Sequence, residues 1–191
     1  DVGANADVKP SYLVQFAQMG AVYAERVMGI ANPRVGLLNI GSEEGKGSEF
    51  AQDVYERLKH AGVNFVGNIE GNVAHKGRAD VIVTDGFTGN VAVKATEGVS
   101  EFIFQELRAA MTSKLKYKLA AMVLRPALLA MRDRVDPGSY GGAPLLGVNG
   151  FVFIAHGHSD ARAIKNAIAR AHDGATSGMT DHIRTALQRK A

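Results

Sequence analysis

The sequence predicts an α/β protein with a mainly parallel sheet. Short apolar runs rich in β-branched residues alternate with longer stretches that repeat apolar side chains at helical spacing. Three of the short runs, 35–40, 81–83 and 151–154, end in loops rich in glycine and polar residues. Such loops are typical of strands that are followed by helices, and strands that alternate with helices favour a mainly parallel α/β sheet.

Local signals predict the elements of the first third of the chain. A helix begins near Pro10, because proline favours the first helical turn, and it ends near Gly29. A strand over 35–40 follows. Ser48 is a good N-cap for the next helix, which leads to a short strand over 63–66.

The later elements continue the same alternation. A strand over 80–84 leads into a long helical stretch, and a strand over 151–154 leads into an amphipathic helix. Thr180 is expected to cap a last amphipathic helix. We therefore expect one α/β unit over residues 1–191, with a helical segment, 96–135, that projects from it.

Composition limits the possible chemistry. The 191 residues are 46% hydrophobic, enough for one domain that buries roughly 70% of its unfolded surface. The chain has no cysteine, which excludes disulfides, thiolate metal ligands and an acyl-cysteine intermediate within it, and is compatible with a reducing cytoplasm. No apolar stretch reaches the ~18 residues needed to span a bilayer, so we expect a soluble or peripherally bound protein.

The junction after the strand over 80–84 has the features of an anion site. Gly86 and Gly89 let the backbone turn sharply and expose N–H groups at a helix start, and Thr88 adds a hydroxyl donor. In an open parallel sheet such loops lie at the carboxyl ends of the strands, where α/β proteins bind ligands. The three glycine-rich loops together therefore predict a phosphate-handling site.

The loop after the first strand places a lysine between two glycines. A P-loop needs four residues between its first glycine and the Gly-Lys pair, whereas three residues separate Gly41 from Gly45. A dinucleotide-binding loop would need glycine or alanine where Phe50 stands. What remains is Lys46, between Gly45 and Gly47, as a point charge for phosphate ahead of a capped helix, or as a solvated surface lysine.

Five sequence blocks occur in one order along the chain: Asp1-Val-Gly-Ala-Asn5 with Lys9-Pro10, Leu37-Leu-Asn-Ile-Gly41 with Glu43-Glu44 and Lys46-Gly47, Thr84-Asp-Gly-Phe-Thr-Gly-Asn90, Tyr140-Gly-Gly-Ala-Pro-Leu-Leu-Gly147, and Ala155-His156-Gly157 with Ser159-Asp160-Ala161. In these blocks the chain resembles the bacterial phosphate acyltransferase family of the PlsX type. The resemblance implies a three-layer fold similar to phosphotransacetylases and isocitrate dehydrogenases, and a homodimer. Family members are longer, so we expect this chain to be their C-terminal half, a fragment of a longer chain.

The resemblance also implies a reaction. Inorganic phosphate attacks the thioester of a fatty acyl group carried on acyl carrier protein, giving acyl phosphate for phospholipid synthesis, with no cofactor, no metal and no nucleic acid partner. One alternative is a phosphotransacetylase acting on short acyl-CoA. Another is a non-catalytic module that binds membrane or carrier protein. Acyl length, carrier and the formation of acyl phosphate distinguish the three.

Candidate roles follow for residues in these blocks. Lys46 and Asn90 are the expected catalytic residues: Lys46 holds phosphate, and the Asn90 amide donates to the thioester oxygen as negative charge develops. Asn90 can equally be an N-cap. Asp85 is expected first to organise its turn, since a carboxylate repels phosphate unless a lysine intervenes. The phosphate- and substrate-binding candidates are Asn5, Gly45, Gly47, Asp85, Gly86, Thr88, Gly89 and His156.

The pattern His156-x-x-x-Asp160 superficially matches a histidine–aspartate motif of several unrelated acyltransferases. In those enzymes the histidine deprotonates an alcohol, whereas phosphate is already an anion and hardly needs a base. We expect His156 to orient its loop or to donate a hydrogen bond to phosphate, and His158 to be exposed. A zinc site is not expected, because further ligands at metal-site spacing are lacking.

Positive charge is concentrated in the stretch Lys114–Arg134. It contains six basic residues and one acidic residue, a net +5, whereas the whole chain carries +3 and the remainder therefore −2. Its short apolar runs suit a membrane surface, a partner helix or an acidic protein, or else a core or dimer helix with a basic rim. The resemblance adds that acyl carrier protein is acidic and that family members bind membrane peripherally. We therefore expect a cytoplasmic, peripherally membrane-associated protein.

Overall fold

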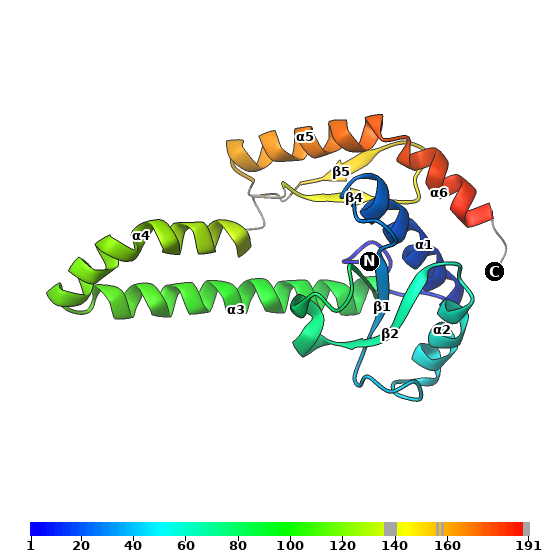
Figure 1. The fold of residues 1–191 in the computed structure, drawn as a ribbon, viewed down its shortest axis with the longest axis horizontal. Helices are drawn as coiled ribbons and strands as arrows, with labels where there is room; N and C mark the ends of the chain where they lie inside the picture. The colour runs from blue at the N-terminus through cyan, green and yellow to red at the C-terminus, as the bar shows by residue number, and fades with distance from the viewer. Residues whose placement is uncertain (136–140, 156, 158, 189–191) are drawn as a thin grey trace. The chain divides into compact units, whose positions relative to one another are not determined.

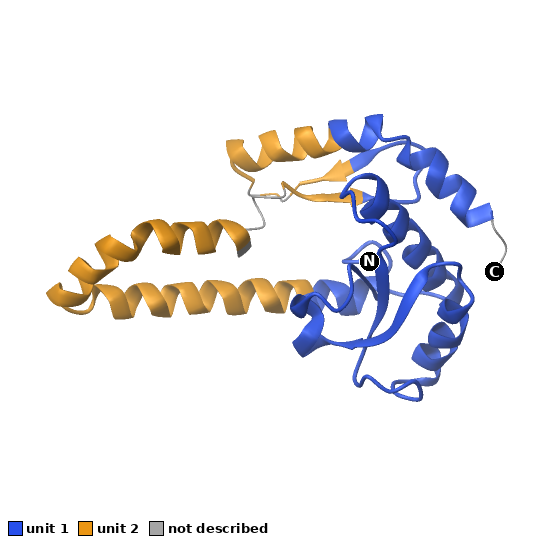
Figure 2. Cartoon of the chain, in the orientation of Figure 1, with its two compact units in different colours: residues 1–92, 145–152, 172–191 blue, residues 93–144, 153–171 orange. Residues whose placement is uncertain are grey.

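The computed structural model describes residues 1–135, 141–155, 157 and 159–188. The chain divides into two compact units (Figure 2). Unit 1 comprises residues 1–92, 145–152 and 172–191, and unit 2 comprises residues 93–144 and 153–171. A single α/β unit over 1–191 stays a prediction, and the expected helical segment, 96–135, falls within unit 2.

A three-stranded parallel sheet forms the centre of unit 1 (Figure 1). Strands β1 (Arg34–Asn39), β2 (Asn64–Glu70) and β3 (Val81–Val83) lie in the order β2-β1-β3, and both pairings are parallel. The central strand β1 is buried at Val35 and Leu37, which are 0% and 2% exposed. Helices flank this sheet on both sides, so the predicted α/β class with a parallel sheet is confirmed.

Helices α1 (Pro10–Arg26) and α2 (Glu49–Lys59) pack against each other, α1 also against β3 and α2 against β2. Pro10 occupies the first turn of α1, as predicted. The Ser48 hydroxyl accepts a hydrogen bond from the Ala51 N–H at 3.2 Å, so the predicted cap of α2 is confirmed. The short helix η1 (Gly71–Lys76) leads from β2 towards β3. The core of these elements contains Leu13, Val14, Ala17, Val35, Leu37, Val54, Tyr55, Leu58, Ala61 and Val83.

Helix α6 (Met179–Gln188) packs against α1, and Met19, Met179 and Ile183 form a second core between them. The prediction that Thr180 caps this helix is wrong. The helix begins at Met179, whose N–H lies 3.2 Å from the Ser177 hydroxyl oxygen. Gly178 adopts a left-handed conformation with φ 68°, which turns the chain into the helix earlier than the capping pattern indicates.

The pairing of β1 with β2 contains one irregularity. Val35 pairs with Phe65 but Leu37 pairs with Asn68, so β2 has one residue more than β1 over this stretch. Gly67, with φ 92°, lies in the stretch of β2 that contains the extra residue. The result is a β-bulge, which changes the face to which every later side chain of β2 points.

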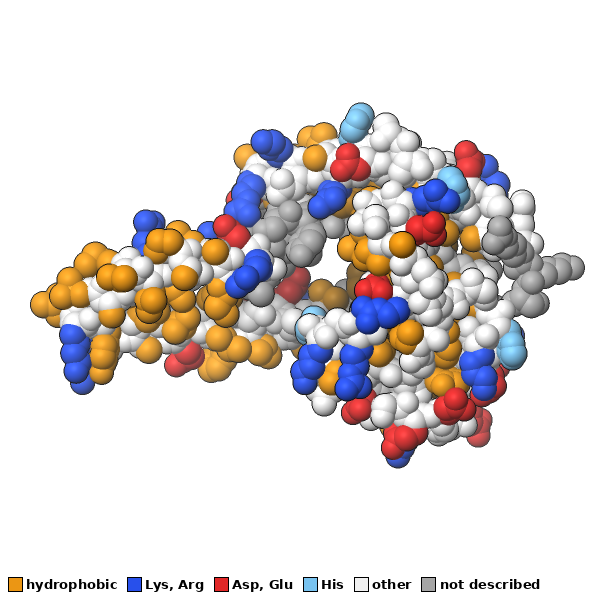
Figure 3. All heavy atoms as spheres, in the orientation of Figure 1, with side chains coloured by type: hydrophobic (Ala, Val, Ile, Leu, Met, Phe, Trp, Pro, Cys, Tyr) orange, Lys and Arg blue, Asp and Glu red, His pale blue; other side chains and the backbone are white. Residues whose placement is uncertain are grey.

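Helices α3 (Gly86–Thr112) and α4 (Leu115–Val135) carry many exposed apolar side chains (Figure 3). Beyond Gly89, no residue of α3 or of the described side chains of α4 is buried. Pro126 lies inside α4. Among the described residues, no helix combines the length and apolarity needed to cross a membrane. The exposed apolar residues of the two helices are Phe87, Val91, Val93, Val99, Phe102, Ile103, Leu115, Tyr117, Leu119, Met122, Val123, Leu124, Leu129 and Met131.

The predicted strand at 151–154 is present as β5 (Val152–Ile154), but it pairs with β4 (Ala143–Leu145) in a separate two-stranded sheet. The expectation that all three glycine-rich loops follow strands of one sheet is therefore wrong for the third loop. A short apolar run predicts a strand but does not identify its partner. The following helix, α5 (Ala161–Thr176), is capped by Asp160, which accepts the Ala163 N–H at 2.8 Å.

An ion pair ties the start of β1 to the residue that precedes β3. Arg34 donates to the Asp80 carboxylate from Nε and Nη2, both at 2.9 Å, and from its backbone N–H at 2.8 Å. The Asp80 N–H returns a bond to the Arg34 carbonyl at 2.8 Å. These bonds from the Arg34 side chain and backbone lower the pKa of Asp80 to about 2.

This ion pair predicts a specific dependence of stability on pH. A carboxyl group whose pKa is lower in the folded state stabilises the fold above its unfolded pKa, near 4, and loses that effect as the pH falls through about 2. Wild-type Tm should therefore exceed that of Asp80→Asn above pH ~4, and the gap should shrink between pH ~4 and ~2. Thermal unfolding by circular dichroism measures this. Asp53→Asn, which removes an exposed ion pair with Arg57 within α2, is the control and should change Tm less. A gap of constant size would contradict the prediction.

Candidate functional site

Two of the predicted junctions lie at the carboxyl edge of the parallel sheet. The loop 40–48 follows β1, and residues 84–85 join β3 to α3. From β1 the chain passes to β2 on one side of β1, and it then crosses to β3 on the other side of β1. Open α/β sheets bind ligands where the strand order switches in this way. The topology therefore brings these candidates to one edge of the sheet: Gly45, Lys46, Gly47, Asp85, Gly86, Thr88, Gly89 and Asn90.

Two asparagines, from β1 and β2, hold one side of the loop 41–47. The Asn39 amide donates to the Lys46 carbonyl at 3.0 Å and to the Asn68 side-chain oxygen at 3.1 Å. The Asn68 amide donates in turn to the Glu43 carbonyl at 2.7 Å. Within the loop, the Lys46 N–H donates to the Glu43 carbonyl at 3.2 Å. The loop backbone is therefore fixed from inside the sheet.

The first turns of α2 hold the other side of this loop. The Gln52 amide donates to the carbonyls of Gly45 and Gly47, at 3.0 Å and 3.2 Å. The Tyr55 hydroxyl donates to the Glu44 carboxylate at 3.1 Å. Burial, followed by this bond and the charge of Glu44, raises the pKa of Tyr55. Four loop carbonyls thus accept hydrogen bonds from amide side chains of the protein.

The Lys46 side chain is exposed, and its stem passes close to Gly41. A Cβ atom on Gly41 would lie 2.9 Å from Lys46 Cγ and 3.0 Å from a carboxylate oxygen of Glu43, so a larger residue there would displace the lysine. Among the described residues, no ion pair involves Lys46. Its ammonium group is therefore available to an anionic ligand at the carboxyl edge.

Asp85 caps α3. Its carboxylate accepts the Thr88 N–H at 2.7 Å, and its carbonyl accepts the Gly89 N–H at 2.9 Å. Partial burial opposes ionisation of this carboxyl group, but hydrogen bonds from the Thr88 backbone and side chain and from the Phe87 backbone outweigh burial and lower the pKa of Asp85. These bonds agree with the expectation that Asp85 organises its turn. They also make it a negative charge at neutral pH.

The N-terminal segment packs against this junction. The Asp1 carboxylate accepts hydrogen bonds from the backbone and side-chain N–H groups of Asn5, both at 2.8 Å. The Asn5 carbonyl accepts the Gly86 N–H at 2.8 Å. The Asn90 amide donates to the Val2 carbonyl at 2.7 Å. Asn5 and Asn90 thus join the N-terminal segment to the first two turns of α3.

These contacts change the expected roles of three residues. The N-cap alternative for Asn90 is wrong, because α3 already begins at Gly86 and Asp85 is its cap. The N–H groups of Gly86 and Gly89 are bonded to the carbonyls of Asn5 and Asp85. A Cβ on Gly86 would lie 2.6 Å from the Asn5 carbonyl oxygen, so close packing explains that glycine. Phosphate binding by these two amides stays a prediction. It requires each N–H to give up its bond to a carbonyl of the protein and to donate to phosphate instead.

Histidine and acidic side chains are the metal ligands open to a chain without cysteine. His156 and His158, which the sequence places after β5, lie outside the described residues. Within the part of the chain that the structure describes, no group of three or more His, Asp or Glu side chains is arranged to hold a metal ion.

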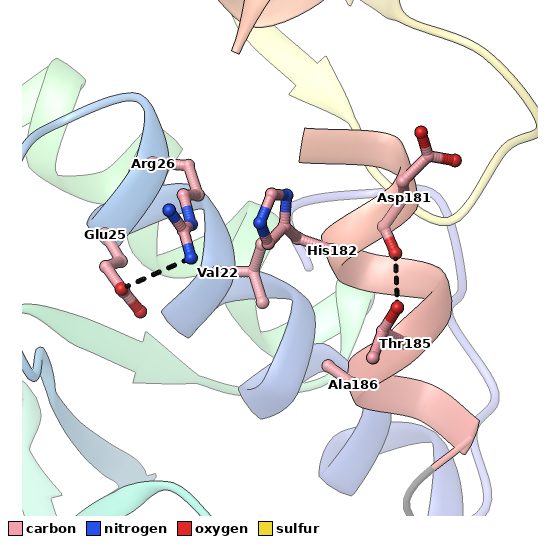
Figure 4. A pocket seen from close by; sticks show the side chains of 7 residues that line it. All are labelled: Val22, Glu25, Arg26, Asp181, His182, Thr185 and Ala186. Carbon is pink, nitrogen blue, oxygen red and sulfur yellow. Dashed lines mark hydrogen bonds and ion pairs between the residues drawn. The ribbon is translucent and has the colours of Figure 1, made fainter. Parts of the chain in front are cut away.

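A separate pocket of about 400 Å³ lies between α1 and α6 (Figure 4). It shares no residue with the two junctions. Arg26 lies 3.8 Å from the Glu25 carboxylate at one wall, and the Thr185 hydroxyl donates to the Asp181 carbonyl at 2.9 Å at the other. Charges of both signs line it, so it has no clear preference for an anion. The lining residues are Val22, Glu25, Arg26, Asp181, His182, Thr185 and Ala186.

Asn39, Asn68 and Gln52 are not among the site residues predicted from the sequence. Asn39 ends β1 directly before the loop, and Gln52 lies one turn after the Ser48 cap. Their positions in the sequence therefore place both amides close to the loop, and both could have been predicted. Asn68 offered none, because the bulge at Gly67 decides the face to which its side chain points.

The chain is similar to known proteins over nearly its whole length. The model of the fatty acid synthesis protein family matches residues 1–182. The chain is similar to curated proteins named phosphate acyltransferase, with 49% identity over 191 residues to that of Bacillus licheniformis, covering 100% of this chain and 58% of the relative. Identity is 48% over 190 residues to that of Desulfitobacterium hafniense and 48% over 189 residues to that of Brevibacillus brevis, each covering 99% of this chain and 57% and 56% of the relative.

The chain therefore spans somewhat more than half the length of these curated relatives. The resemblance to phosphate acyltransferases, predicted from five sequence blocks, is confirmed, and the match lies in the C-terminal half of that family, as expected. Because the family model covers 1–182, nearly the whole sequence, the chain belongs to the fatty acid synthesis protein family.

Proposed function

We propose that this chain forms the phosphate-binding half of an acyltransferase that moves a fatty acyl group from acyl carrier protein to inorganic phosphate. A phosphate oxygen forms a bond to the thioester carbonyl carbon, the carbon–sulfur bond breaks, and the carrier leaves as its thiol. The single observation that carries the proposal is the exposed Lys46 ammonium on a loop held by four amide-to-carbonyl bonds at the carboxyl edge. Membership of the family supports it.

The charges at this edge give Lys46 its role. Asp85 is ionised, and the loop itself carries Glu43 and Glu44, so a phosphate approaching the edge is repelled by carboxylates. Lys46 is the one basic residue of the loop 41–47. Its ammonium offsets this repulsion and orients the phosphate through charge-assisted hydrogen bonds. Orientation of two reactants is itself worth several kcal/mol of the barrier.

Asn90 has the chemistry of an oxyanion donor. An asparagine amide has two N–H donors, and the bond to the Val2 carbonyl uses one of them. We propose that the second donates to the thioester oxygen as negative charge develops on it. The bond to Val2 also fixes the orientation of the amide, which supports this role because a preorganised donor is the effective one.

Formation of acyl phosphate tests the proposal. Native protein containing this chain is incubated with inorganic phosphate and long-chain acyl carrier protein, long-chain acyl-CoA or acetyl-CoA, and acyl phosphate is trapped with hydroxylamine. The expected result is hydroxamate together with an equal amount of free carrier thiol, fastest with acyl carrier protein. Faster reaction with acetyl-CoA would identify a short-chain phosphotransacetylase. No product with any donor would leave a non-catalytic module that binds membrane or carrier protein.

The helices α3 and α4 support a further part of the proposal, peripheral binding to the membrane from the cytoplasm. Val123 and Leu124 are 80% and 53% exposed, within a segment that carries six basic residues. Exposed apolar side chains with a basic rim favour adsorption to an anionic bilayer surface. Docking of the acidic acyl carrier protein and a homodimer contact are the other proposed uses of the Lys114–Arg134 segment.

Binding to anionic vesicles tests the membrane part. The double variant Leu124→Glu, Leu128→Glu should bind at least about tenfold more weakly than wild type, since inserting carboxylates removes the gain from burying two leucines. Wild-type binding should weaken with salt, because charge attraction is screened within ~8 Å at physiological ionic strength. Flotation with vesicles measures both.

The matched control is Ile168→Glu, which places a carboxylate at another exposed apolar residue of unit 2, outside the segment, and should leave vesicle binding unchanged. Acyl phosphate formation in solution should persist in the double variant. Loss of dimerisation or of folding in the double variant, seen by sedimentation or circular dichroism, would assign these leucines to an interface instead.

A further inference from the structure

The Asn39 and Asn68 side chains meet because β2 contains the bulge at Gly67. Side chains alternate between the faces of a strand, so Leu37 and Asn39 share one face of β1. Asn68 pairs with Leu37 and therefore shares that face. Without the extra residue, position 68 would pair with residue 38 and point to the opposite face. The bulge is thus what delivers an asparagine amide from β2 to the loop after β1.

Asn68 is buried, with 7% exposure, and both ends of its amide are used. Its oxygen accepts a bond from Asn39, and its nitrogen donates to the Glu43 carbonyl. A buried amide that loses its partner carries a free-energy penalty, because water cannot replace the lost bond. Any movement of the loop away from β2 therefore leaves Asn68 unsatisfied. The asparagine pair favours one arrangement of the loop over all others.

One member of this pair, Asn39, also contacts Lys46, the residue that carries the ammonium group. Asn39 donates to the carbonyl of Lys46. The next residue, Gly47, has φ 91°, and a Cβ there would lie 2.5 Å from the Asn39 side-chain oxygen. Only glycine fits between the asparagine and the loop in this conformation. Asn39 therefore holds the backbone on the C-terminal side of Lys46, and Gln52 holds the carbonyl of Gly45 on the other side.

We propose that Asn39 and Asn68 are positioning residues: through the loop 41–47 they hold the Lys46 ammonium where it binds phosphate. This inference rests on the proposed function. A loop that is already ordered binds phosphate without first adopting a rarer conformation, and apparent affinity falls in proportion to the population of the competent state. Loss of the pair therefore weakens phosphate binding but leaves the chemical step unchanged once phosphate is saturating.

The test compares Asn68→Ala with Asn64→Ala in native protein. Asn64 lies on the same strand, but its amide bonds the Asn32 carbonyl, away from the loop. For Asn68→Ala, we expect the KM for inorganic phosphate to rise about tenfold and kcat to stay within about threefold. Amide hydrogen exchange should become about tenfold faster in residues 42–47 and remain unchanged in β1 and β3. Asn64→Ala should match wild type in both measurements.

A lower kcat with an unchanged KM would overturn the inference, and so would exchange and KM values that do not change. If Asn68→Ala unfolds, Asn39→Asp decides instead, because it keeps the size of the side chain but removes the N–H donor to Lys46, and the same changes are expected. Failure of the proposed function can be distinguished from failure of this inference, because wild type would then form no acyl phosphate. In that case, titration of wild type and variant with inorganic phosphate, followed by the amide signals of residues 42–47, decides: equal affinity or no binding overturns the inference.

Discussion

Lys46→Ala should lower acyl phosphate formation by about 10²-fold to 10³-fold and leave the fold intact. The loss is large because Lys46 supplies the one positive charge of the loop 41–47, at the edge of the sheet that also carries the ionised Asp85. Stability should change little, since the side chain is exposed and the loop is held through its carbonyls rather than through the ammonium. Initial rates at several phosphate concentrations, with circular dichroism, measure both.

Two variants make this result specific. Lys46→Arg keeps the charge and should retain part of the activity, because a guanidinium also binds phosphate but with different geometry. Lys59→Ala removes an exposed lysine of α2 that pairs with Glu56, and it should leave the rate unchanged. Near wild-type activity in Lys46→Ala would remove this residue from the mechanism.

Asn90→Ala should lower kcat by about 10²-fold or more, while the free energy of unfolding falls by only ~1 kcal/mol. The small structural effect follows from the single exposed hydrogen bond to the Val2 carbonyl. The large kinetic effect follows if the second N–H stabilises the oxyanion. Measuring kcat and chemical denaturation on one preparation separates the two effects.

Asn90→Asp provides the control, since it keeps the shape of the side chain and replaces both donors with an acceptor. It should be at least as inactive as Asn90→Ala. A variant that loses about 1 kcal/mol of stability but keeps kcat within about threefold would reduce Asn90 to a link with the N-terminal segment.

Elements that depend on neighbouring residues were predictable from the sequence. The Ser48 hydroxyl caps α2 because capping needs only a side chain and an N–H three residues away. Pro10 starts α1 for a similar local reason. The strand after Asp80 is apolar, with Val83 buried and its other two residues half-buried, and it pairs in the sheet as its sequence indicates.

Features that depend on distant residues were not predictable in this way. The run 151–154 forms a strand, but its partner is β4 and not the parallel sheet. The bulge at Gly67 is a property of how β2 lies against β1, and it turns Asn68 towards the loop. The same limit applies to the candidate site. A local Gly-Lys-Gly pattern in a family block predicts Lys46, whereas the bonds of Asn90 to Val2 and of Gly86 to Asn5 depend on a segment more than 80 residues earlier.

Pro126 limits how deeply α4 can enter a bilayer. A proline inside a helix has no N–H to give to the carbonyl four residues earlier, here that of Met122. In hydrocarbon, a carbonyl without a donor costs several kcal/mol, so the turn around Met122 is most stable where water molecules or lipid headgroups can reach it. The proposed membrane contact of α4 is therefore expected in the headgroup layer rather than among the acyl chains beneath it.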